Sequence, residues 1–394
     1  MQTTYPLVSI SGTPQERGTE YGQAVPERIK RCVSYYRTEL EKISLPAEIQ
    51  RNLISEFGEQ IDKFCPDHTI EMRAIADACG VSLEDIVLIN ARTEIIAKAR
   101  ILANDHIKDT CDGECTGILV LPSRSQSGRL LQAQNWDWLT DAQDSTIVLR
   151  VLNDNGPSFL TLVEAGCLAR NGINSAGIAL NGNYLSSDLD YTQTGVPLTS
   201  LRRRALEQEH LALAMRLLAA TPKACSNNVI ISQNGWGMDF ECAPSESFPL
   251  MPEDGILTHS NHFLSPIALG KIKEVGLKNS ADTYYRAWRT RALLEECGEK
   301  ISVDDIKRVL ADDWGAPYSI CRPPLNTLSG TNTCTLATMI MDTEHCALEI
   351  AAMPSEGQSF VRYELTGQPT SAGSPCASIH DAAAADGSPL ARSA

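Results

Sequence analysis

The stretch that decides the fold is Cys111-Asp112-Gly113-Glu114-Cys115-Thr116-Gly117-Ile118-Leu119-Val120. Before it, apolar residues recur at the spacing of amphipathic helices. After it, they alternate as in β-strands, beginning with Ile118. The segment Gln132–Asp137 is typical of the partner strand of a hairpin. The chain therefore changes from a helical part to a strand-rich part at this point, with Cys115 at the start of the first strand.

Working outward, the pattern predicts helices before the junction at 13–43, 46–64, 66–79 and 82–102, followed by an exposed polar loop at 103–114. After the junction it predicts strands at 116–122, 129–136, 146–152, 159–164, 176–181, 227–232, 237–242, 256–259, 334–341, 345–351 and 359–364. Helices are expected among them at 198–219, 281–297 and 303–312. This order predicts an α+β fold, a four-layer αββα sandwich of two antiparallel sheets.

Composition narrows the class of protein. The 394 residues are 43% hydrophobic and 21% charged, which is typical of a globular protein with a sizeable core. The net charge of −15 argues against nucleic acid or an anionic membrane as the main partner. We expect no membrane-spanning segment and no secretory signal, so the cytoplasm is the expected location. The thirteen scattered cysteines are expected to be mostly buried, reduced thiols.

Cys115 is the candidate nucleophile. If the chain cuts the Glu114–Cys115 bond itself, the new α-amino group lies beside its own thiol. An α-amine has an ordinary pKa of about 7.7–8.0 and can accept the thiol proton near neutral pH. The cleavage would follow the same logic, with thiol attack on the preceding carbonyl giving a thioester that water opens. The alternative is that Cys115 is one buried core thiol among the thirteen.

Three polar residues are candidates for the site around this cysteine. Asp137, at the end of the partner strand, can hydrogen-bond an ammonium group; the alternative is a turn-capping carboxylate. Asn261 carries an amide N–H that can stabilise an oxyanion, or it caps a loop. Arg322 can hold a substrate carboxylate or keep the site positive, or it is a surface residue.

Other motifs are weaker. His259 and His262 lie three residues apart on an extended segment without a completing ligand, so no metal site and no cofactor are expected. The run Arg202-Arg203-Arg204 can meet phosphates but is more typical of a solvated helix face. Ser226, at a strand start, either assists processing or caps the strand.

Together these segments resemble the acyl-coenzyme A:6-aminopenicillanic acid acyltransferase (isopenicillin N acyltransferase) family of N-terminal nucleophile hydrolases, cysteine type. The resemblance covers about residues 10–365. The segments that carry it are Ser11-Gly12-Thr13-Pro14, Glu20-Tyr21-Gly22, Ile89-Asn90-Ala91-Arg92-Thr93-Glu94, Cys115-Thr116, Gln134-Asn135-Trp136-Asp137, Glu164-Ala165-Gly166, Gly172-Ile173-Asn174-Ser175-Ala176-Gly177, Thr194-Gly195-Val196-Pro197, His259-Ser260-Asn261-His262 and Pro317-Tyr318-Ser319-Ile320-Cys321-Arg322.

The resemblance implies self-cleavage before Cys115. The products would be an α subunit, residues 1–114, and a β subunit of 394 − 114 = 280 residues that remain together. It also implies one integrated domain, with the catalytic part at 115–365. The low-complexity composition of 366–394, rich in Gly, Pro, Ser, Ala and Asp, predicts a disordered tail. The implied roles are Cys115 as nucleophile, Asp137 as its polar neighbour, Asn261 in the oxyanion hole, Arg322 near the cysteine and Ser226 in processing.

The implied activity moves an acyl group from a thioester or amide donor, with acyl-CoA one candidate, to an amine acceptor. An alternative is an amidohydrolase of N-acyl amines such as β-alanyl amines, working through the same acyl-enzyme. A third interpretation is an unprocessed, inactive paralogue that acts as a binding protein. It rests on Glu114, because the family typically has Gly before the cysteine. The C-terminal residues also differ from the peroxisomal signal of the penicillin enzyme, which favours a different location and substrate.

Overall fold

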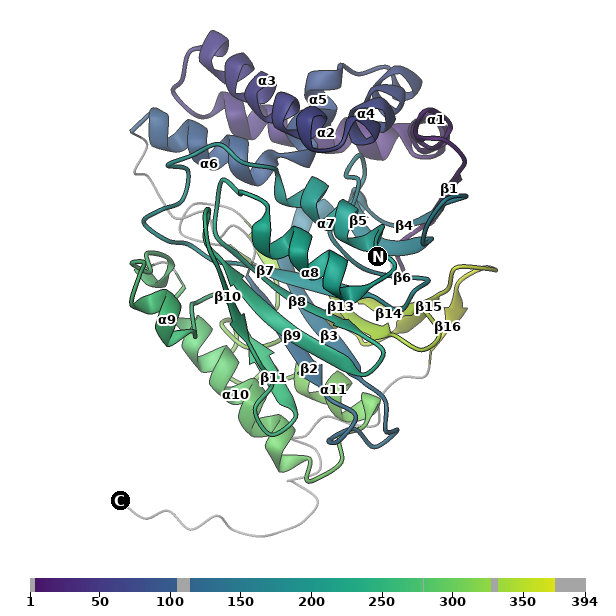
Figure 1. The fold of residues 1–394 in the computed structure, drawn as a ribbon, viewed down its shortest axis with the longest axis vertical. Helices are drawn as coiled ribbons and strands as arrows, with labels where there is room; N and C mark the ends of the chain where they lie inside the picture. The colour runs from purple at the N-terminus through teal and green to yellow at the C-terminus, as the bar shows by residue number, and fades with distance from the viewer. Residues whose placement is uncertain (1–3, 105–113, 279, 327–331, 373–394) are drawn as a thin grey trace.

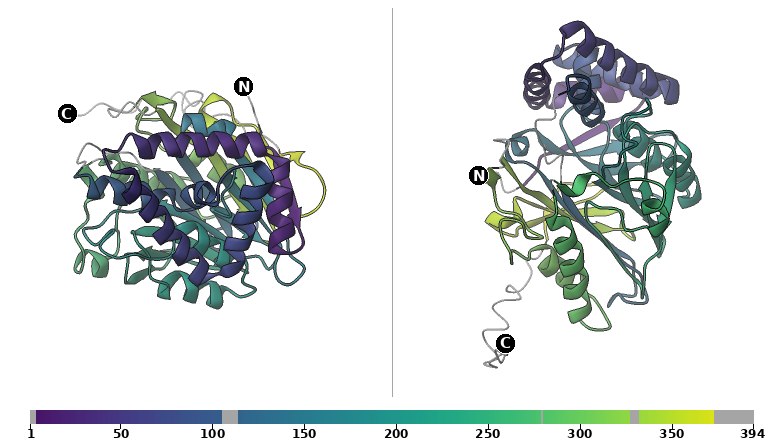
Figure 2. Two further views of the ribbon diagram at one scale, coloured as in Figure 1. Left: turned by 90° about the horizontal axis from the view of Figure 1, so that it is seen from above. Right: turned by 90° about the vertical axis from the view of Figure 1, so that its left-hand side faces the viewer.

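The computed structural model describes residues 4–104, 114–278, 280–326 and 332–372, and these form four layers in the order helices, sheet, sheet, helices. Figures 1 and 2 show the helices of the N-terminal part gathered at one end of the molecule. The two sheets stack below them, with α7 and α8 on one side and α10 on the other. The predicted αββα architecture is therefore confirmed.

The helices are α1 (Pro14–Ala24), α2 (Pro26–Glu41), α3 (Ala47–Phe64), α4 (Pro66–Cys79), α5 (Leu83–Asn90), α6 (Arg92–Leu102), α7 (Leu198–Leu206), α8 (Leu211–Ala220), α9 (Pro266–Leu269), α10 (Asp282–Glu296) and α11 (Val303–Leu310). The predicted helix at 13–43 is two helices, because Pro26 cannot donate a backbone hydrogen bond and begins a new one. Capping boxes at Thr13 and Ser82 fix two of the starts.

The first sheet has the strand order β1 (Leu7–Ser11), β4 (Thr146–Leu152), β5 (Phe159–Glu164), β6 (Asn171–Asn174), β7 (Ala179–Tyr184), β8 (Asn227–Gln233), β9 (Trp236–Cys242), β10 (Ser247–Leu250). All neighbours pair antiparallel except β1 and β4, which are parallel. The predicted antiparallel pairing holds in this sheet except at this edge, where the N-terminal segment adds β1 in parallel to β4.

The second sheet has the order β11 (Ile256–His259), β2 (Cys115–Val120), β3 (Leu131–Leu139), β13 (Asn332–Asp342), β14 (Ala347–Ala352), β15 (Phe360–Tyr363), β16 (Thr370–Ser371), with β12 (Leu325–Asn326) beside β13. The predicted hairpin is confirmed, since β2 and β3 pair antiparallel with Cys115 opposite Trp136. Part of the expected disordered tail lies in β16, and the rest falls outside the described residues.

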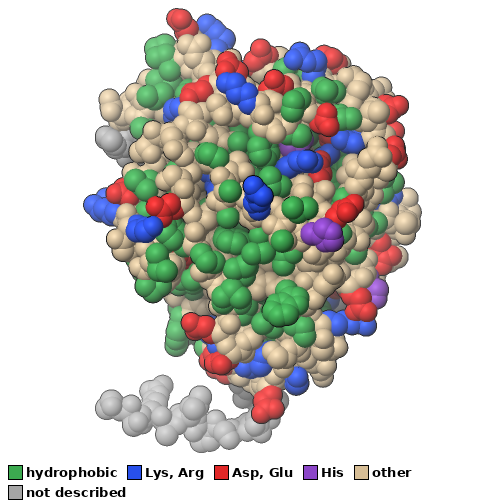
Figure 3. All heavy atoms as spheres, viewed as in Figure 1, with side chains coloured by type: hydrophobic (Ala, Val, Ile, Leu, Met, Phe, Trp, Pro, Cys, Tyr) green, Lys and Arg blue, Asp and Glu red, His purple; other side chains and the backbone are tan. Residues whose placement is uncertain are grey.

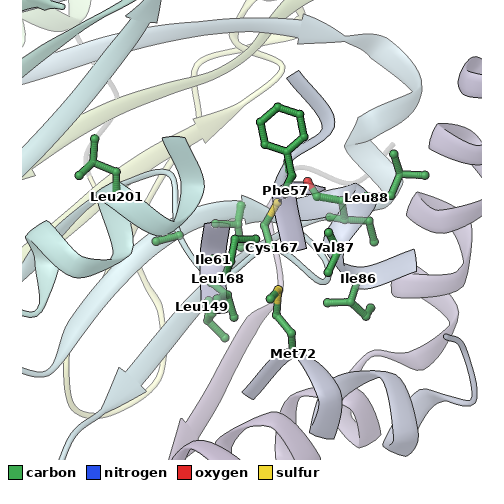
Figure 4. Packing of buried hydrophobic residues seen from close by; sticks show 14 of the residues in the cluster. Phe57, Ile61, Met72, Ile86, Val87, Leu88, Leu149, Cys167, Leu168 and Leu201 are labelled. Carbon is green, nitrogen blue, oxygen red and sulfur yellow. Dashed lines mark hydrogen bonds between the residues drawn. The ribbon is translucent and has the colours of Figure 1, made fainter. Parts of the chain in front are cut away.

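Among the apolar clusters of the described residues, three join the layers. Helices α1–α8 share the first of them with the first sheet, and Figure 4 shows side chains from this cluster. Residues between the sheets form a second core that includes Trp136, Met339 and Leu162. A third lies between the second sheet and α10 and α11, and includes Ile118 and Leu294. Apolar contacts therefore join the part before residue 114 to the part after it.

The surface carries charges of both signs. Figure 3 shows acidic and basic side chains interspersed around hydrophobic side chains that gather over the region of α8, β9 and β10. None of the helices in the described part of the chain has the length and apolarity that a membrane span requires.

Candidate active site

Cys115 is the first residue of β2 and is buried. Successive side chains of a strand point to opposite faces. A Cβ on Gly117 would approach Ile230 of the first sheet, whereas Thr116 accepts a hydrogen bond from Arg286 of α10. The Cys115 side chain therefore faces the space between the sheets, in the core that also holds Trp136.

Both polar atoms of the Glu114–Cys115 peptide bond are hydrogen-bonded. The backbone N–H of Asp137 donates to the carbonyl oxygen of Glu114 at 2.8 Å. The backbone N–H of Cys115 donates to Oδ1 of Asn261, also at 2.8 Å. The first bond places a donor on the carbonyl, where negative charge develops under nucleophilic attack. The second holds the nitrogen that would become the α-amine.

The Glu114 side chain is buried, so the predicted exposure of the junction is wrong at this residue. Its carboxylate accepts hydrogen bonds from Nη2 of Arg286 at 3.1 Å and from Oγ of Ser280 at 2.5 Å, and it forms an ion pair with Arg322. Charge-assisted bonds of this kind compensate the cost of burying a carboxylate. The remainder of the predicted loop, 105–113, lies outside the described residues.

Arg286 is a central residue that sequence reasoning missed. It is fully buried on α10, and its Nη1 donates to the carbonyl oxygen of Cys115 at 2.7 Å. Its Nη2 donates to Oδ1 of Asn261 at 3.0 Å, and its Nε pairs with Asp282 at 3.0 Å. The sequence signal was a lone arginine in an ordinary helix, and its contacts are formed only in the folded chain.

Asp137 and Arg322 also lie at the Glu114–Cys115 junction. Oδ1 of Asp137 accepts a hydrogen bond from Thr335 at 2.7 Å, and Nε of Arg322 lies 3.4 Å from Oδ2 of Asp137. Burial raises the pKa of the Asp137 carboxyl to about 7, against a smaller opposing effect of Arg286. The structure therefore brings Asp137 and Arg322 together at the bond before Cys115.

The Cys115 thiol is a weak acid in this setting. Burial and then the charge of Asp137 raise its pKa to about 12. The thiolate is the nucleophilic form, so near neutral pH this thiol needs a base to take its proton.

Asn261 lies beside Cys115 in the uncut chain. Its Oδ1 accepts hydrogen bonds from two donors, the Cys115 nitrogen and Arg286. These donors orient the side-chain amide with its oxygen toward Cys115. Its Nδ2 donates to the carbonyl oxygen of Tyr184 at 3.0 Å. In the continuous chain Asn261 therefore holds the cysteine nitrogen.

Ser226 belongs to a different cluster. Its Oγ donates to Asp190 at 2.5 Å and lies 2.9 Å from Oγ of Ser187, and its backbone N–H also donates to Asp190. Among the residues that the structure describes, these contacts do not connect it to Cys115.

The run of three arginines on α7 is not a solvated face. Arg202 and Arg203 are buried, and only Arg204 is exposed. The reason is that α7 packs into the interior at this turn: Arg203 pairs with Glu71 at 3.0 Å and with Glu207 at 2.7 Å.

The two histidines do not share a ligand position. His259 hydrogen-bonds to Glu241 at 2.8 Å and lies 3.7 Å from Asp239, while His262 bonds to Thr283. No group of three or more potential ligands suited to a metal ion occurs within 4–104, 114–278, 280–326 and 332–372.

Comparison with known proteins identifies a family. The model of the family described as acyl-coenzyme A:6-aminopenicillanic acid acyl-transferase matches residues 123–352, which is more than half of the chain. A curated relative from Emericella nidulans, the acyl-coenzyme A:6-aminopenicillanic-acid-acyltransferase 40 kDa form, is 27% identical over 331 residues. That alignment covers 80% of this chain and 84% of the relative.

Among solved structures, a mutant of the conjugated bile acid hydrolase from Clostridium perfringens is similar with a TM-score of 0.45 and 12% identity, over 66% of this chain and 96% of that one. The penicillin V acylase from Agrobacterium tumefaciens is similar with a TM-score of 0.38 and 12% identity, over 64% of this chain and 92% of that one.

Proposed function

Because this chain belongs to the acyl-coenzyme A:6-aminopenicillanic acid acyltransferase family, we propose that it is an acyltransferase that cuts itself before Cys115 and uses the new N-terminal cysteine as its nucleophile. The observation that carries the proposal is the pair of hydrogen bonds on the Glu114–Cys115 peptide, from Asp137 N–H to the carbonyl oxygen and from the Cys115 N–H to Asn261.

In the cleavage step, Sγ of Cys115 attacks the carbonyl carbon of Glu114. The Asp137 N–H stabilises the oxyanion, and the Cys115 nitrogen leaves with the thiol proton. A Glu114 thioester on Cys115 results. Water then opens this thioester, which releases the Glu114 carboxylate and regenerates the thiol beside a free α-amine.

In the catalytic step, the α-amine of Cys115 accepts the thiol proton while Sγ attacks the carbonyl of the donor. The leaving thiol or amine of the donor takes the proton, and an acyl thioester remains on Cys115. Oδ1 of Asn261, which accepts the Cys115 N–H, orients the amine, with Asp137 as its polar neighbour. In the cleavage step the departing Cys115 nitrogen takes the thiol proton; after cleavage the free α-amine is the base for turnover, for a thiol whose pKa burial raises to about 12 in the uncut chain.

The second substrate decides between two activities. Attack by an amine on the acyl thioester gives transfer, with acyl-CoA a candidate donor. Attack by water gives amide hydrolysis, with N-acyl amines such as β-alanyl amines as substrates. Incubation of the cut enzyme with an acyl-CoA and an amine, and separately with an N-acyl amine alone, distinguishes them. Turnover of the second mixture only would reject the transferase and leave the amidohydrolase.

The unprocessed paralogue is the competing function, and the burial of Glu114 bears on it. Glu114 is held by Arg286, Ser280 and Arg322, so its side chain is accommodated at the junction and does not displace the peptide from its two hydrogen bonds. Intact mass of the purified protein tests the point. A single uncut chain that stays unchanged on incubation would remove the free-amine mechanism.

A further inference from the structure

Two neighbouring arginines on α7 are buried in opposite electrostatic settings. Arg203 is paired with Glu71 and Glu207. Arg202 is 6% exposed, and its Nε is buried without a hydrogen-bond partner in the part of the chain that the structure describes. Burying an uncompensated charge is costly, so a guanidinium in this state points to a missing anion.

Arg202 lines the same cavity as the candidate nucleophile. It lines a cavity of about 40 Å³ together with Cys115, Trp136 and Trp138. Gly182 lies against it: a Cβ there would come within 2.3 Å of Nη2 of Arg202. The absence of a side chain at Gly182 therefore leaves the room that the guanidinium occupies.

The charges around Arg202 do not compensate it. Glu94 acts on it from a distance, but Oε1 of Glu94 accepts the backbone N–H of Leu198 at 2.8 Å, and within the described residues no ion pair joins Glu94 to Arg202. Arg170 also lines this cavity, but it is a second cation and cannot compensate Arg202; its own acidic partner is Glu164, at 3.7 Å. Burial lowers the pKa of Arg202, as expected for a cation without a partner.

We propose that Arg202 binds a carboxylate of the substrate whose acyl group passes through Cys115. The inference rests on the proposed function, which makes Cys115 the reacting residue. It adds the class of substrate. A single guanidinium matches a carboxylate through two parallel N–H bonds, and the small cavity suits this group better than a nucleotide phosphate. Trp136 and Trp138 form an apolar wall beside it. The substrate therefore carries both an apolar part and a carboxylate.

The carboxylate can belong to the acyl half or to the amine half, and two matched substrate pairs separate these cases. One pair is N-hexanoyl-phenylalanine and its C-terminal amide. The other is glutaryl anilide and butyryl anilide. The wild-type enzyme is expected to prefer the carboxylate member of one pair in kcat/KM on the order of 100-fold. In Arg202→Met that preference falls close to one, and Arg202→Lys restores part of it.

Equal losses on both members of each pair, or a wild-type enzyme that ignores the carboxylate, would overturn the assignment. A binding measurement keeps it separate from the proposed function. Calorimetry with 3-phenylpropanoate, against 3-phenylpropanamide, reports the site even without turnover. Arg202-dependent binding in a protein that never cuts itself would reject the proposed function and retain the carboxylate site. Self-cleavage and turnover that do not depend on Arg202 would retain the proposed function and reject the carboxylate site.

Arg203→Met is the matched control for folding. It removes the fully buried cation that Glu71 and Glu207 share and is expected to lower the melting temperature markedly. Arg202→Met removes an uncompensated charge at similar volume and is expected to melt at or above the wild-type temperature. If Arg202→Met melts far below wild type, as Arg203→Met does, Arg202 is a structural residue and the proposal fails.

Discussion

At the scale of single residues, Cys115 combines a buried thiol with a preceding peptide bond whose carbonyl oxygen and nitrogen are both hydrogen-bonded. Cys115→Ala is expected to remain a single chain and to lose activity on the order of 10³-fold or more, because no thioester can form. Cys115→Ser is expected to cut slowly, since a hydroxyl is the poorer nucleophile. Intact mass over time checks both. A Cys115→Ala chain that is still cut before residue 115 would refute self-processing.

Asp137 gives a prediction on pH. Its carboxyl has a pKa of about 7 in the folded chain and an ordinary value of about 3.9 when unfolded. Its contribution to stability is therefore fully present below about pH 4 and is lost as the pH rises through 7. In the uncut Cys115→Ala background, Asp137→Asn is expected to gain stability relative to its parent as the pH rises, by up to about 4 kcal/mol at pH 8. Urea unfolding at pH 5 and pH 8 measures this.

Asp85→Asn is the opposite-sign control for that experiment. Burial disfavours the charge of Asp85, but hydrogen bonds from Ser82 and Arg37 outweigh it and hold the pKa of this carboxyl below its usual value. Asp85→Asn should therefore be less stable than its parent at pH 8, and this loss of stability should become smaller as the pH falls. If Asp137→Asn behaved like Asp85→Asn, the carboxyl of Asp137 would be a stabilising ion-pair member, and the prediction for Asp137 would be wrong.

At the scale of elements, helix α10 connects to the β2 junction through Arg286. In the Cys115→Ala background, Arg286→Met should lower the free energy of unfolding by about 3 kcal/mol, because Glu114 and Asp282 lose a buried cation. With Cys115 in place, the same change should slow cleavage. Arg291→Met is the control on the same helix: its ion pair with Glu295 is partly exposed, so a loss of about 1 kcal/mol or less is expected. Equal losses would show that α10 acts only as packing.

The elements also show what the sequence predicts and why. The period-2 pattern after residue 115 predicted the β2–β3 hairpin, and with it the position of Asp137 beside the junction, because pairing in a hairpin is local. The buried state of Glu114 and the place of Arg286 could not be predicted, since these partners are 172 residues apart. The burial of Arg202 and Arg203 was missed for the same reason: a run of charges is typical of a surface until distant acids and a cavity are known.

At the scale of the whole molecule, the cut is expected to leave the two fragments associated. The first fragment contributes β1 to the first sheet, and its helices share one apolar core with that sheet (Figure 4). Residues 1–114 and 115–394 should therefore co-elute in gel filtration as one particle and separate only in denaturant. Elution of the larger fragment alone in native buffer would contradict this description of the interface.

The central claim is cleavage at one bond by the protein's own cysteine, and an intact-mass time course of freshly purified wild-type chain beside Cys115→Ala tests it most directly. We predict that the 42.9 kDa chain gives way to two masses, those of residues 1–114 and 115–394, in wild type only. A wild-type chain that persists uncut, or a cut at any other bond, would contradict it.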